Sequence, residues 1–223
     1  MGLRVVVLII LCYLLSAAPT LNGAPQAGRI AKSASPGAGG ESRPPDMPAY
    51  PPPILMGIPS KPIRVGKQTK FLPDLALLDQ NGQKVRFYSD LVKDKRVLIS
   101  FFYTTCAYIC LMQGQVLSDL QTELGNRLGK DVYLISVTMD PETDTPERLK
   151  AWAKQHGLRK GWTLVTGGKT EMAKLVGHLT GNPLGRIEQH SSLVYIGNDK
   201  TNTWIATYGL AAPKTLMQTI EEM

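Results

Sequence analysis

The 223-residue sequence predicts a mixed α/β fold, with a central mixed sheet flanked by helices. Two nearly uninterrupted apolar runs, at 96–103 and 131–138, are typical of strands buried on both faces. Helical spacing of apolar residues follows each run, so strand and helix alternate. Hairpin signals on both sides, at 71–88 and 191–208, add antiparallel strands to this sheet.

The first elements are an N-terminal hairpin, a strand and a helix. Residues 71–78 and 84–88 have strand-like composition, and a turn with Asn81-Gly82 separates them. After the strand at 96–103, apolar residues recur at spacings of three and four, as one helix face requires: Ile109, Met112, Val116, Leu120 and Leu124.

The second half of the domain continues the alternation. A helix at 145–156 is well signalled, because Asp144 or Thr145 can cap it and Pro146 suits its first turn. The remaining predicted elements are a strand at 162–165, a helix at 170–179, strands at 191–196 and 203–208 joined by a turn at 197–200, and a helix at 213–222.

The N-terminal 62 residues differ from this domain in composition. Arg4 and an apolar run at 5–15 resemble a secretory signal, and we assign it to residues 1–24. The run is shorter than the ~20 residues of a membrane span, although an uncleaved anchor remains an alternative. Residues 25–62 are rich in Pro, Gly and Ala and predict a disordered tether, which leaves 63–223 as the folded domain.

The charge and cysteine content exclude several classes of protein. The 25 basic residues outnumber the 18 acidic ones, but they occur singly rather than in a dense run. We therefore predict no nucleic-acid binding. Three cysteines are too few for a disulfide scaffold or a four-cysteine zinc site. Cys12 lies inside the predicted signal, so an exported protein would retain only Cys106 and Cys110.

Cys106 and Cys110 form a C-x-x-x-C pair at the end of the strand at 96–103. Open α/β sheets bind ligands at the carboxyl ends of their strands, and a thioredoxin-like fold keeps its reactive cysteines at this point. Residues four apart share one helix face, and a helix N-terminus favours the thiolate. Two such sulfurs suit Cu(I). The alternative, a structural disulfide, would close only a very small loop and add little constraint.

One of the three histidines is a candidate metal ligand. His190 stands at the entry to the strand at 191–196, after an irregular stretch. Thioredoxin-like oxidoreductases usually carry a cis-proline at about this point, facing their cysteines. Imidazole is the commonest metal ligand, and it would also allow Cu(II). His156 at a helix end and His178 within a helix are predicted to be structural or solvated.

Three separated segments resemble the Sco/SenC family of copper-binding, thioredoxin-like cytochrome c oxidase assembly proteins. They are FFYTTCAYIC at 101–110, SVTMDPETDTPERLKAW at 136–152 and QHSSLVYIG at 189–197. The resemblance implies that Cys106, Cys110 and His190 bind one copper ion, Cu(I) or Cu(II). It implies delivery of copper to the oxidase copper centre, or reduction of that centre's cysteines. Asp140 and Asp144 fall on the family's acidic segment.

The sequence departs from the family pattern in three places. Leu111 stands where the family usually has proline, and Gln189 replaces an acidic residue that often precedes the histidine. The N-terminal apolar run is shorter than the family's usual membrane anchor.

We therefore predict an exported metallochaperone or thiol reductant rather than a turnover enzyme. Its expected location is the periplasm or the outer face of the inner membrane, with the tether or an anchor allowing membrane proximity. The expected partner is the copper-centre subunit of cytochrome c oxidase or another copper protein. One alternative is an exported thiol–disulfide oxidoreductase that needs no metal. Another is a peroxide-reducing enzyme, for which Thr104 and Thr105 are the only supporting residues near Cys106.

Overall fold

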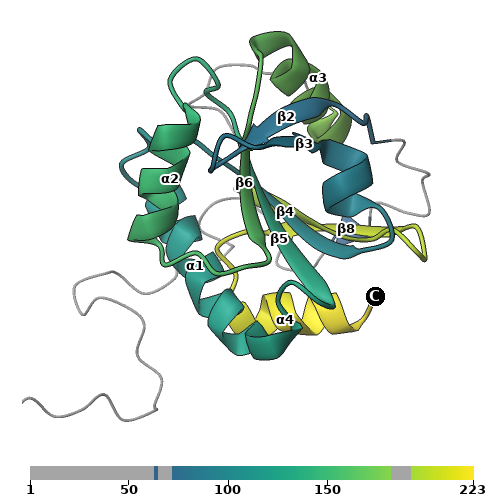
Figure 1. The fold of residues 1–223 in the computed structure, drawn as a ribbon. Helices are drawn as coiled ribbons and strands as arrows, with labels where there is room; N and C mark the ends of the chain where they lie inside the picture. Colours follow the sequence, from purple (N-terminus) through teal and green to yellow (C-terminus); the bar gives the residue numbers. More distant parts are fainter. Residues whose placement is uncertain (1–62, 65–71, 182–191) are drawn as a thin grey trace, which may run out of the picture. The chain divides into compact units, whose positions relative to one another are not determined.

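The computed structural model describes residues 63–64, 72–181 and 192–223. The predicted signal at 1–24 and tether at 25–62 lie outside these residues, and so does His190. In the described residues one sheet has the order β1-β8-β7-β4-β5-β6-β2-β3 (Figure 1). Its strands are β1 (Ile63–Arg64), β2 (Ala76–Asp79), β3 (Lys84–Arg86), β4 (Arg96–Phe102), β5 (Val132–Thr138), β6 (Trp162–Thr166), β7 (Leu193–Asn198) and β8 (Thr203–Tyr208).

The sheet is mixed, as the sequence predicted. Strands β4, β5 and β6 are parallel, while β7, β8, β1, β2 and β3 pair antiparallel with their neighbours. The parallel strands carry the apolar runs, because helices cover both of their faces. Along β4, Arg96 pairs with Val132 and Phe102 with Thr138. The carboxyl ends of β4 and β5 therefore lie beside each other at one edge of the domain.

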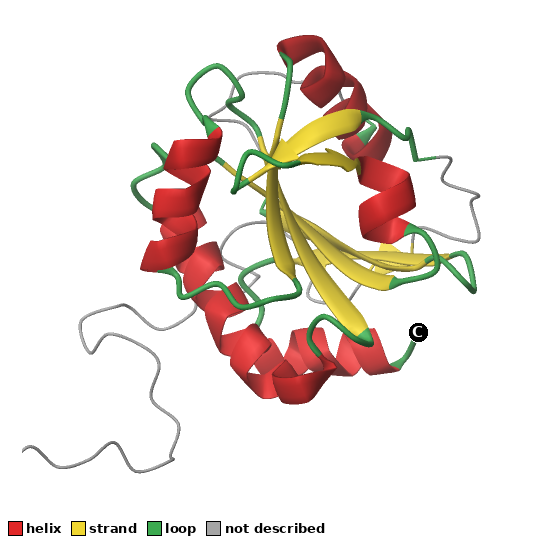
Figure 2. Cartoon of the chain, in the orientation of Figure 1, coloured by secondary structure: helices red, strands yellow, loops and turns green. Residues whose placement is uncertain are grey.

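Helices flank the sheet on both faces (Figures 1 and 2). They are α1 (Ile109–Leu124), α2 (Pro146–Gln155), α3 (Lys169–Thr180) and α4 (Pro213–Glu221), with a π-helical turn η2 (Phe87–Val92) and a short 3-10 turn η3 (Gly125–Arg127). None of the helices within the described ranges has both the length and the apolar composition to cross a membrane.

The side chains on the two faces of β4 belong to two separate hydrophobic clusters. Leu98 and Phe102 belong to a cluster that includes side chains of α1, α2 and α4. Val97, Ile99 and Phe101 belong to a second cluster, with side chains of α3 and η2. Alternation along the strand produces this division, since successive side chains point to opposite faces. The strand is thus held from both sides, and so is the loop that leaves its end.

Several predicted boundaries differ from the structure. The first strand of the hairpin, predicted at 71–78, begins only at Ala76 and ends at Asp79. The strand predicted at 84–88 ends at Arg86, because the chain turns so that both Phe87 and Val92 become buried. The backbone N–H of Arg86 donates to the Asp90 carboxylate over 2.7 Å, which supports this turn. The turn predicted at 197–200 comes later, because β7 continues to Asn198. Its side-chain amide donates to the Met223 carbonyl over 2.8 Å.

Candidate functional site

The two cysteines lie in the loop after β4 and at the start of α1. Cys106 lies in a turn, where its backbone N–H donates to the Tyr103 carbonyl over 3.2 Å. Helix α1 begins three residues later. Cys110 is the second residue of α1. The expectation that both sulfurs share a helix face is therefore wrong for Cys106, which precedes the helix. Both residues are buried and are not joined by a disulfide.

The sulfur of Cys106 accepts a hydrogen bond from a backbone group in the first turn of α1. The N–H of Cys110 donates to Cys106 Sγ over 3.3 Å. The first N–H groups of a helix have no partner within it, so an electron-rich sulfur is favoured there. This contact brings the two residues together without requiring that both be helical.

The environment separates the acidities of the two thiols. Burial alone would raise the pKa of Cys106, but hydrogen bonds outweigh it and lower the pKa. The donors are the Cys110 thiol, the backbone N–H groups of Tyr108 and Cys110, and the Tyr103 side chain. For Cys110, burial raises the pKa strongly and the hydrogen bond with Cys106 adds to the effect. Cys106 is thus the more readily ionised thiol of the pair, and Cys110 the less readily ionised one.

A buried carboxylate supports the loop that carries Cys106. Asp144 is completely buried and accepts the backbone N–H of Thr104 at 3.1 Å from both of its oxygens. It also accepts the hydroxyls of Thr104 and Thr138. Arg148 Nε donates to the Thr104 hydroxyl over 3.1 Å. The carboxylate joins the ends of β4 and β5, and its negative charge further raises the pKa of Cys110.

This network refines the sequence interpretation of Asp144. Of the two predicted caps, Thr145 is the N-cap of α2, and its side chain accepts the N–H of Arg148 over 3.5 Å. Asp144 turns inward instead. Thr104 is bound to it, although the two residues lie 40 positions apart and no local pattern links them. Asp140 lies on the same segment, where its carboxylate accepts the N–H of Thr143 over 3.3 Å.

The sequence predicts the two described histidines to be structural or solvated, and in the structure His156 is buried and His178 is exposed. His178 lies exposed on α3, and its Nδ1 contacts the Lys174 carbonyl over 2.8 Å. His156 follows α2 and is buried, with its ring 3.9 Å from the ring of Trp152. His156 is the C-cap residue of α2, and burial lowers its pKa to about 4, which favours the neutral ring. The third histidine, His190, is not among the described residues, and its predicted role as a ligand stays a prediction.

The strand that follows His190 in the sequence is anchored to α1. The Ser192 carbonyl accepts the N–H of Gly209 over 2.7 Å and the side-chain amide of Gln113 over 3.4 Å. Gln113 lies three residues, almost one helical turn, after Cys110. No sequence pattern indicates this contact, because a single glutamine on an apolar helix face resembles an ordinary core substitution.

An exposed aromatic ring lies between the two cysteines. Tyr108 is 73% exposed and is the one large hydrophobic residue of that kind in the described ranges. Its neighbours Ile109 and Leu111 are half-buried. Leu111 occupies the position where the resembled family usually has proline, yet α1 begins before it, at Ile109. The surface beside Cys106 is therefore partly apolar.

The donor atoms of the pair suit a soft metal ion. Two adjacent sulfurs, one of them favoured as thiolate, are the ligands that Cu(I) prefers. Within the described ranges, no group of three His, Cys, Asp or Glu residues is placed to hold a metal. The two cysteines therefore fit copper as a pair of sulfur ligands, and a third ligand would have to come from elsewhere.

Solved structures with the same fold include Sco proteins. The chain is similar to BsSco, described as a member of the Sco family of cytochrome c oxidase assembly proteins, with 24% identity and a TM-score of 0.56. That match covers 67% of this chain and 91% of BsSco. Copper-bound ScoI of Bradyrhizobium japonicum is 22% identical with a TM-score of 0.54, over 73% of this chain and 97% of that one. These similarities confirm the thioredoxin-like fold.

Sequence comparison identifies the family. The SCO1 protein homolog of Bacillus subtilis is 34% identical over 90 residues, which are 40% of this chain and 45% of that protein. The matched segments span less than half of the length of the curated relatives. The SCO1/SenC family model matches residues 64–223, nearly the whole predicted domain. The chain therefore belongs to the SCO1/SenC family.

Proposed function

We propose that this protein is an exported copper-binding assembly factor for the copper centre of cytochrome c oxidase. The observation that carries the proposal is the buried thiol pair at the end of β4, in which Cys106 Sγ accepts the N–H of Cys110. Membership of the SCO1/SenC family supports it, and so do the similar structures of BsSco, a member of a family of cytochrome c oxidase assembly proteins, and of copper-bound ScoI. A location in the periplasm or on the outer face of the inner membrane is part of the proposal.

One copper ion would be held by Cys106, Cys110 and His190. The two sulfurs supply the soft ligands, and an imidazole would complete a three-coordinate site for Cu(I). The anchored Ser192 supports the choice of His190, because it follows that histidine by only two residues and contacts α1 beside the cysteines. Copper is the cargo in this function, and ligand exchange with the copper-centre subunit would pass it on.

The difference between the thiols favours a second function, reduction of the client's cysteines. The Cys106 thiolate would attack one sulfur of a client disulfide, forming a mixed disulfide and releasing one client thiolate. Cys110 would then lose its proton and attack Cys106 Sγ, releasing the second client thiolate. The client gains two electrons as a dithiol, and Cys106 and Cys110 are left as a disulfide. The lowered pKa of Cys106 supports its role as the attacking group.

Anaerobic titration of the reduced protein with Cu(I), against a Cu(I)-specific chelator, tests the copper function. We expect one equivalent to bind the wild-type protein, and we expect Cys106→Ser or Cys110→Ser to abolish that binding. His190→Ala should weaken it at least about tenfold through the loss of one ligand. His178→Ala is the matched control, since His178 lies exposed on α3, and it should bind as the wild type does. Absence of copper uptake by the reduced wild-type protein would end the copper proposal.

Reduction of a disulfide-containing peptide tests the second function with the same variants. If the thiols act as a reductase, Cys106→Ser loses all activity and Cys110→Ser stops at a mixed disulfide that mass spectrometry detects. His190→Ala would retain activity. Turnover by Cys110→Ser at the wild-type rate would exclude this mechanism.

A further inference from the structure

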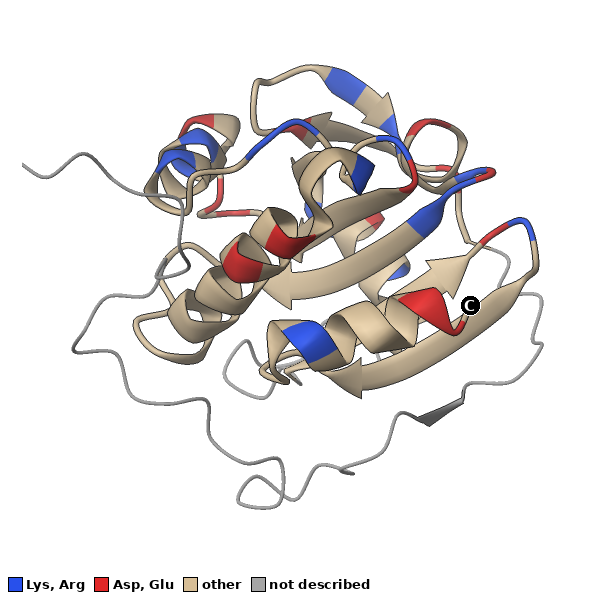
Figure 3. Cartoon of the chain, turned by 90° about the horizontal axis from the view of Figure 1, so that it is seen from below, with Lys and Arg blue, Asp and Glu red and all other residues tan. Residues whose placement is uncertain are grey.

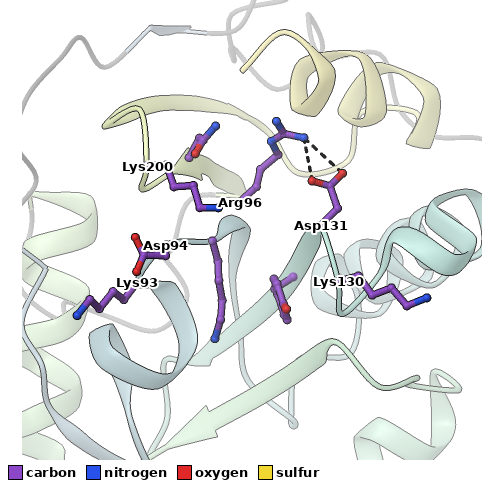
Figure 4. Close-up of a pocket in the computed structure, with 9 residues that line it drawn as sticks. Lys93, Asp94, Arg96, Lys130, Asp131 and Lys200 are labelled. Carbon is purple, nitrogen blue, oxygen red and sulfur yellow. Dashed lines mark hydrogen bonds and ion pairs between the residues drawn. The ribbon is translucent and has the colours of Figure 1, made fainter.

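A concave site lies at the opposite end of β4 from the cysteines. Its volume is about 380 Å³, and three separate turns supply its walls. They are the turn that enters β4, the start of β5, and the turn between β7 and β8 (Figure 4). Arg96 begins β4 and Phe102 ends it, so six residue steps, or roughly 20 Å, separate the pocket from the cysteine loop.

The pocket concentrates positive charge that the sequence distributes widely. Five basic and two acidic side chains line it, a net formal charge of +3: Lys93, Lys95, Arg96, Lys130 and Lys200 against Asp94 and Asp131. Over the described ribbon as a whole, basic and acidic positions are interspersed (Figure 3). In Figure 4, Lys93 and Lys130 point outward on opposite sides of the pocket, whereas Arg96 turns toward Asp131.

Arg96 is poorly neutralised where it stands. Its Nη1 is 3.4 Å from Asp131, whereas Arg127 holds the same carboxylate at 2.9 Å. Its Nη2 lies 3.5 Å from the Met223 carbonyl. Its buried Nε has no hydrogen-bond partner among the described residues. A guanidinium has five N–H donors, so Arg96 retains capacity for an anionic acceptor.

The lysines also lack carboxylate partners. No ion pair within the described ranges involves any of the four lysines of the pocket. Lys95 instead donates to the Asp90 carbonyl, and its ammonium lies 4.9 Å from the centre of the Tyr133 ring. Burial lowers the pKa of Lys95, although the nearby Asp90 carboxylate opposes this shift. A bound anion would supply the missing negative charge.

We propose that this pocket binds an anion carrying phosphate groups, with Arg96 and Lys200 as the main contacts. Guanidinium and ammonium groups together are characteristic of phosphate recognition. The two cationic groups of Arg96 and Lys200 suit a multiply charged phosphate better than a single carboxylate. The volume lies near the lower end of the range for small-ligand sites, so a compact phosphate fits better than an extended acidic chain. The phosphate belongs to a free anion or to a lipid headgroup.

Calorimetric titration of the full chain with pyrophosphate, at constant ionic strength, tests the proposal. We expect saturable binding, weakened about tenfold or more by Lys200→Glu and also by Arg96→Lys, which keeps the charge but loses the fork of donors. Lys150→Glu on α2 is the matched control, because it makes the same charge change at an exposed site elsewhere and should leave binding within about twofold. Circular dichroism checks that each variant is folded.

A parallel experiment separates the two sources of phosphate. Sedimentation with phosphatidylglycerol vesicles, against phosphatidylcholine vesicles, measures binding to lipid headgroups. The site is supported if a probe binds the wild type and Lys150→Glu but not Lys200→Glu. The probe that behaves in this way identifies the source of the phosphate. Failure to bind either probe would overturn the proposal. The proposal would also be overturned if Lys200→Glu and Lys150→Glu weakened binding equally. The same holds if poly-glutamate bound more tightly than the phosphate probes and depended on Lys200 to the same degree. A Cys106→Ser, Cys110→Ser protein should bind as the wild type does, which separates this site from the copper function.

Discussion

The backbone N–H of Cys110 donates a hydrogen bond to the sulfur of Cys106 over 3.3 Å. Within this short loop the first cysteine receives hydrogen bonds that stabilise its negative charge, while the second is enclosed by apolar side chains. The pair is therefore unequal before any metal or client arrives. The difference in pKa between the two thiols should therefore appear as a measurable difference in their reactivity.

The two cysteines should react with an alkylating reagent in a fixed order. Because its pKa is lowered, Cys106 should be modified by iodoacetamide with a midpoint below the ordinary cysteine value of 9.0. The pKa of Cys110 is raised, so it should remain protonated and largely unmodified over the same pH range. Peptide-resolved mass spectrometry of the reduced protein at a series of pH values measures both rates. Faster modification of Cys110 would contradict the assignment of the thiolate.

Replacing Asp144 should loosen the loop before Cys106. Asp144→Asn loses a charged acceptor of several hydrogen bonds and introduces an N–H₂ group beside two hydroxyls, so we expect a stability loss of at least about 2 kcal/mol. Urea denaturation measures it. Removal of the negative charge should also lower the pKa of Cys110. Asp140→Asn, on the same segment but only half-buried, is the control and should cost clearly less. Equal losses would show that the Asp144 network contributes little.

His156 should make the fold sensitive to acid. Its folded pKa of about 4 lies below the unfolded value of 6.5, so the unfolded state binds the proton first as pH falls. This destabilisation is absent at pH 7, grows below pH 6.5 and is complete below pH 4. We expect a loss of about 2 kcal/mol by pH 4.5.

Comparison of urea denaturation at pH 7 and pH 4.5 isolates this effect. His156→Gln cannot titrate, so its stability should fall less with acid than that of the wild type, whatever its stability at pH 7. His178→Gln is the control, since His178 is exposed, and it should follow the wild type. An unchanged pH dependence in His156→Gln would disprove the burial argument.

Gly209→Ala should disturb the anchor of β7 and, with it, copper binding. A Cβ atom there would lie 2.5 Å from the Ser192 carbonyl oxygen and even closer to the Gln113 amide. Because one contact is with backbone, the start of β7 must shift. If His190 is a ligand, copper affinity should fall about tenfold, as for a misplaced ligand.

Gly197→Ala provides the comparison for this substitution. Its Cβ would collide with the ring of Trp204 at the opposite end of the same hairpin. It should lower the melting temperature but leave copper affinity unchanged. If both glycine variants lose copper affinity equally, the effect is general destabilisation and not the position of Ser192.

Apolar patterning predicted the central strands and the helices well. The runs at 96–103 and 131–138 correspond to β4 and β5 within one residue, because strands covered on both faces need apolar residues throughout. The Asn81-Gly82 hairpin is also confirmed, with Gly82 at φ 74°. Local signals of this kind suffice wherever an element is defined by its own residues.

Contacts between distant segments were beyond sequence reasoning. Asp144 looked like a helix cap because its neighbours satisfy the capping pattern, while its actual partners Thr104 and Thr138 come from other strand ends. The basic residues were read as dispersed, which holds along the chain, but three turns bring five of them together. The spacing of Cys106 and Cys110 located the site, although it did not show that α1 begins between them.

The exposed ring of Tyr108 has a consequence for selectivity. A macromolecule that binds over Tyr108 displaces the water around this ring, and burial of the apolar ring favours a partner with a complementary hollow. A hydrated ion that diffuses to the sulfurs gains nothing from the same ring. The exposed ring therefore favours a large partner with an apolar surface over a small hydrated ion, before any sulfur chemistry begins.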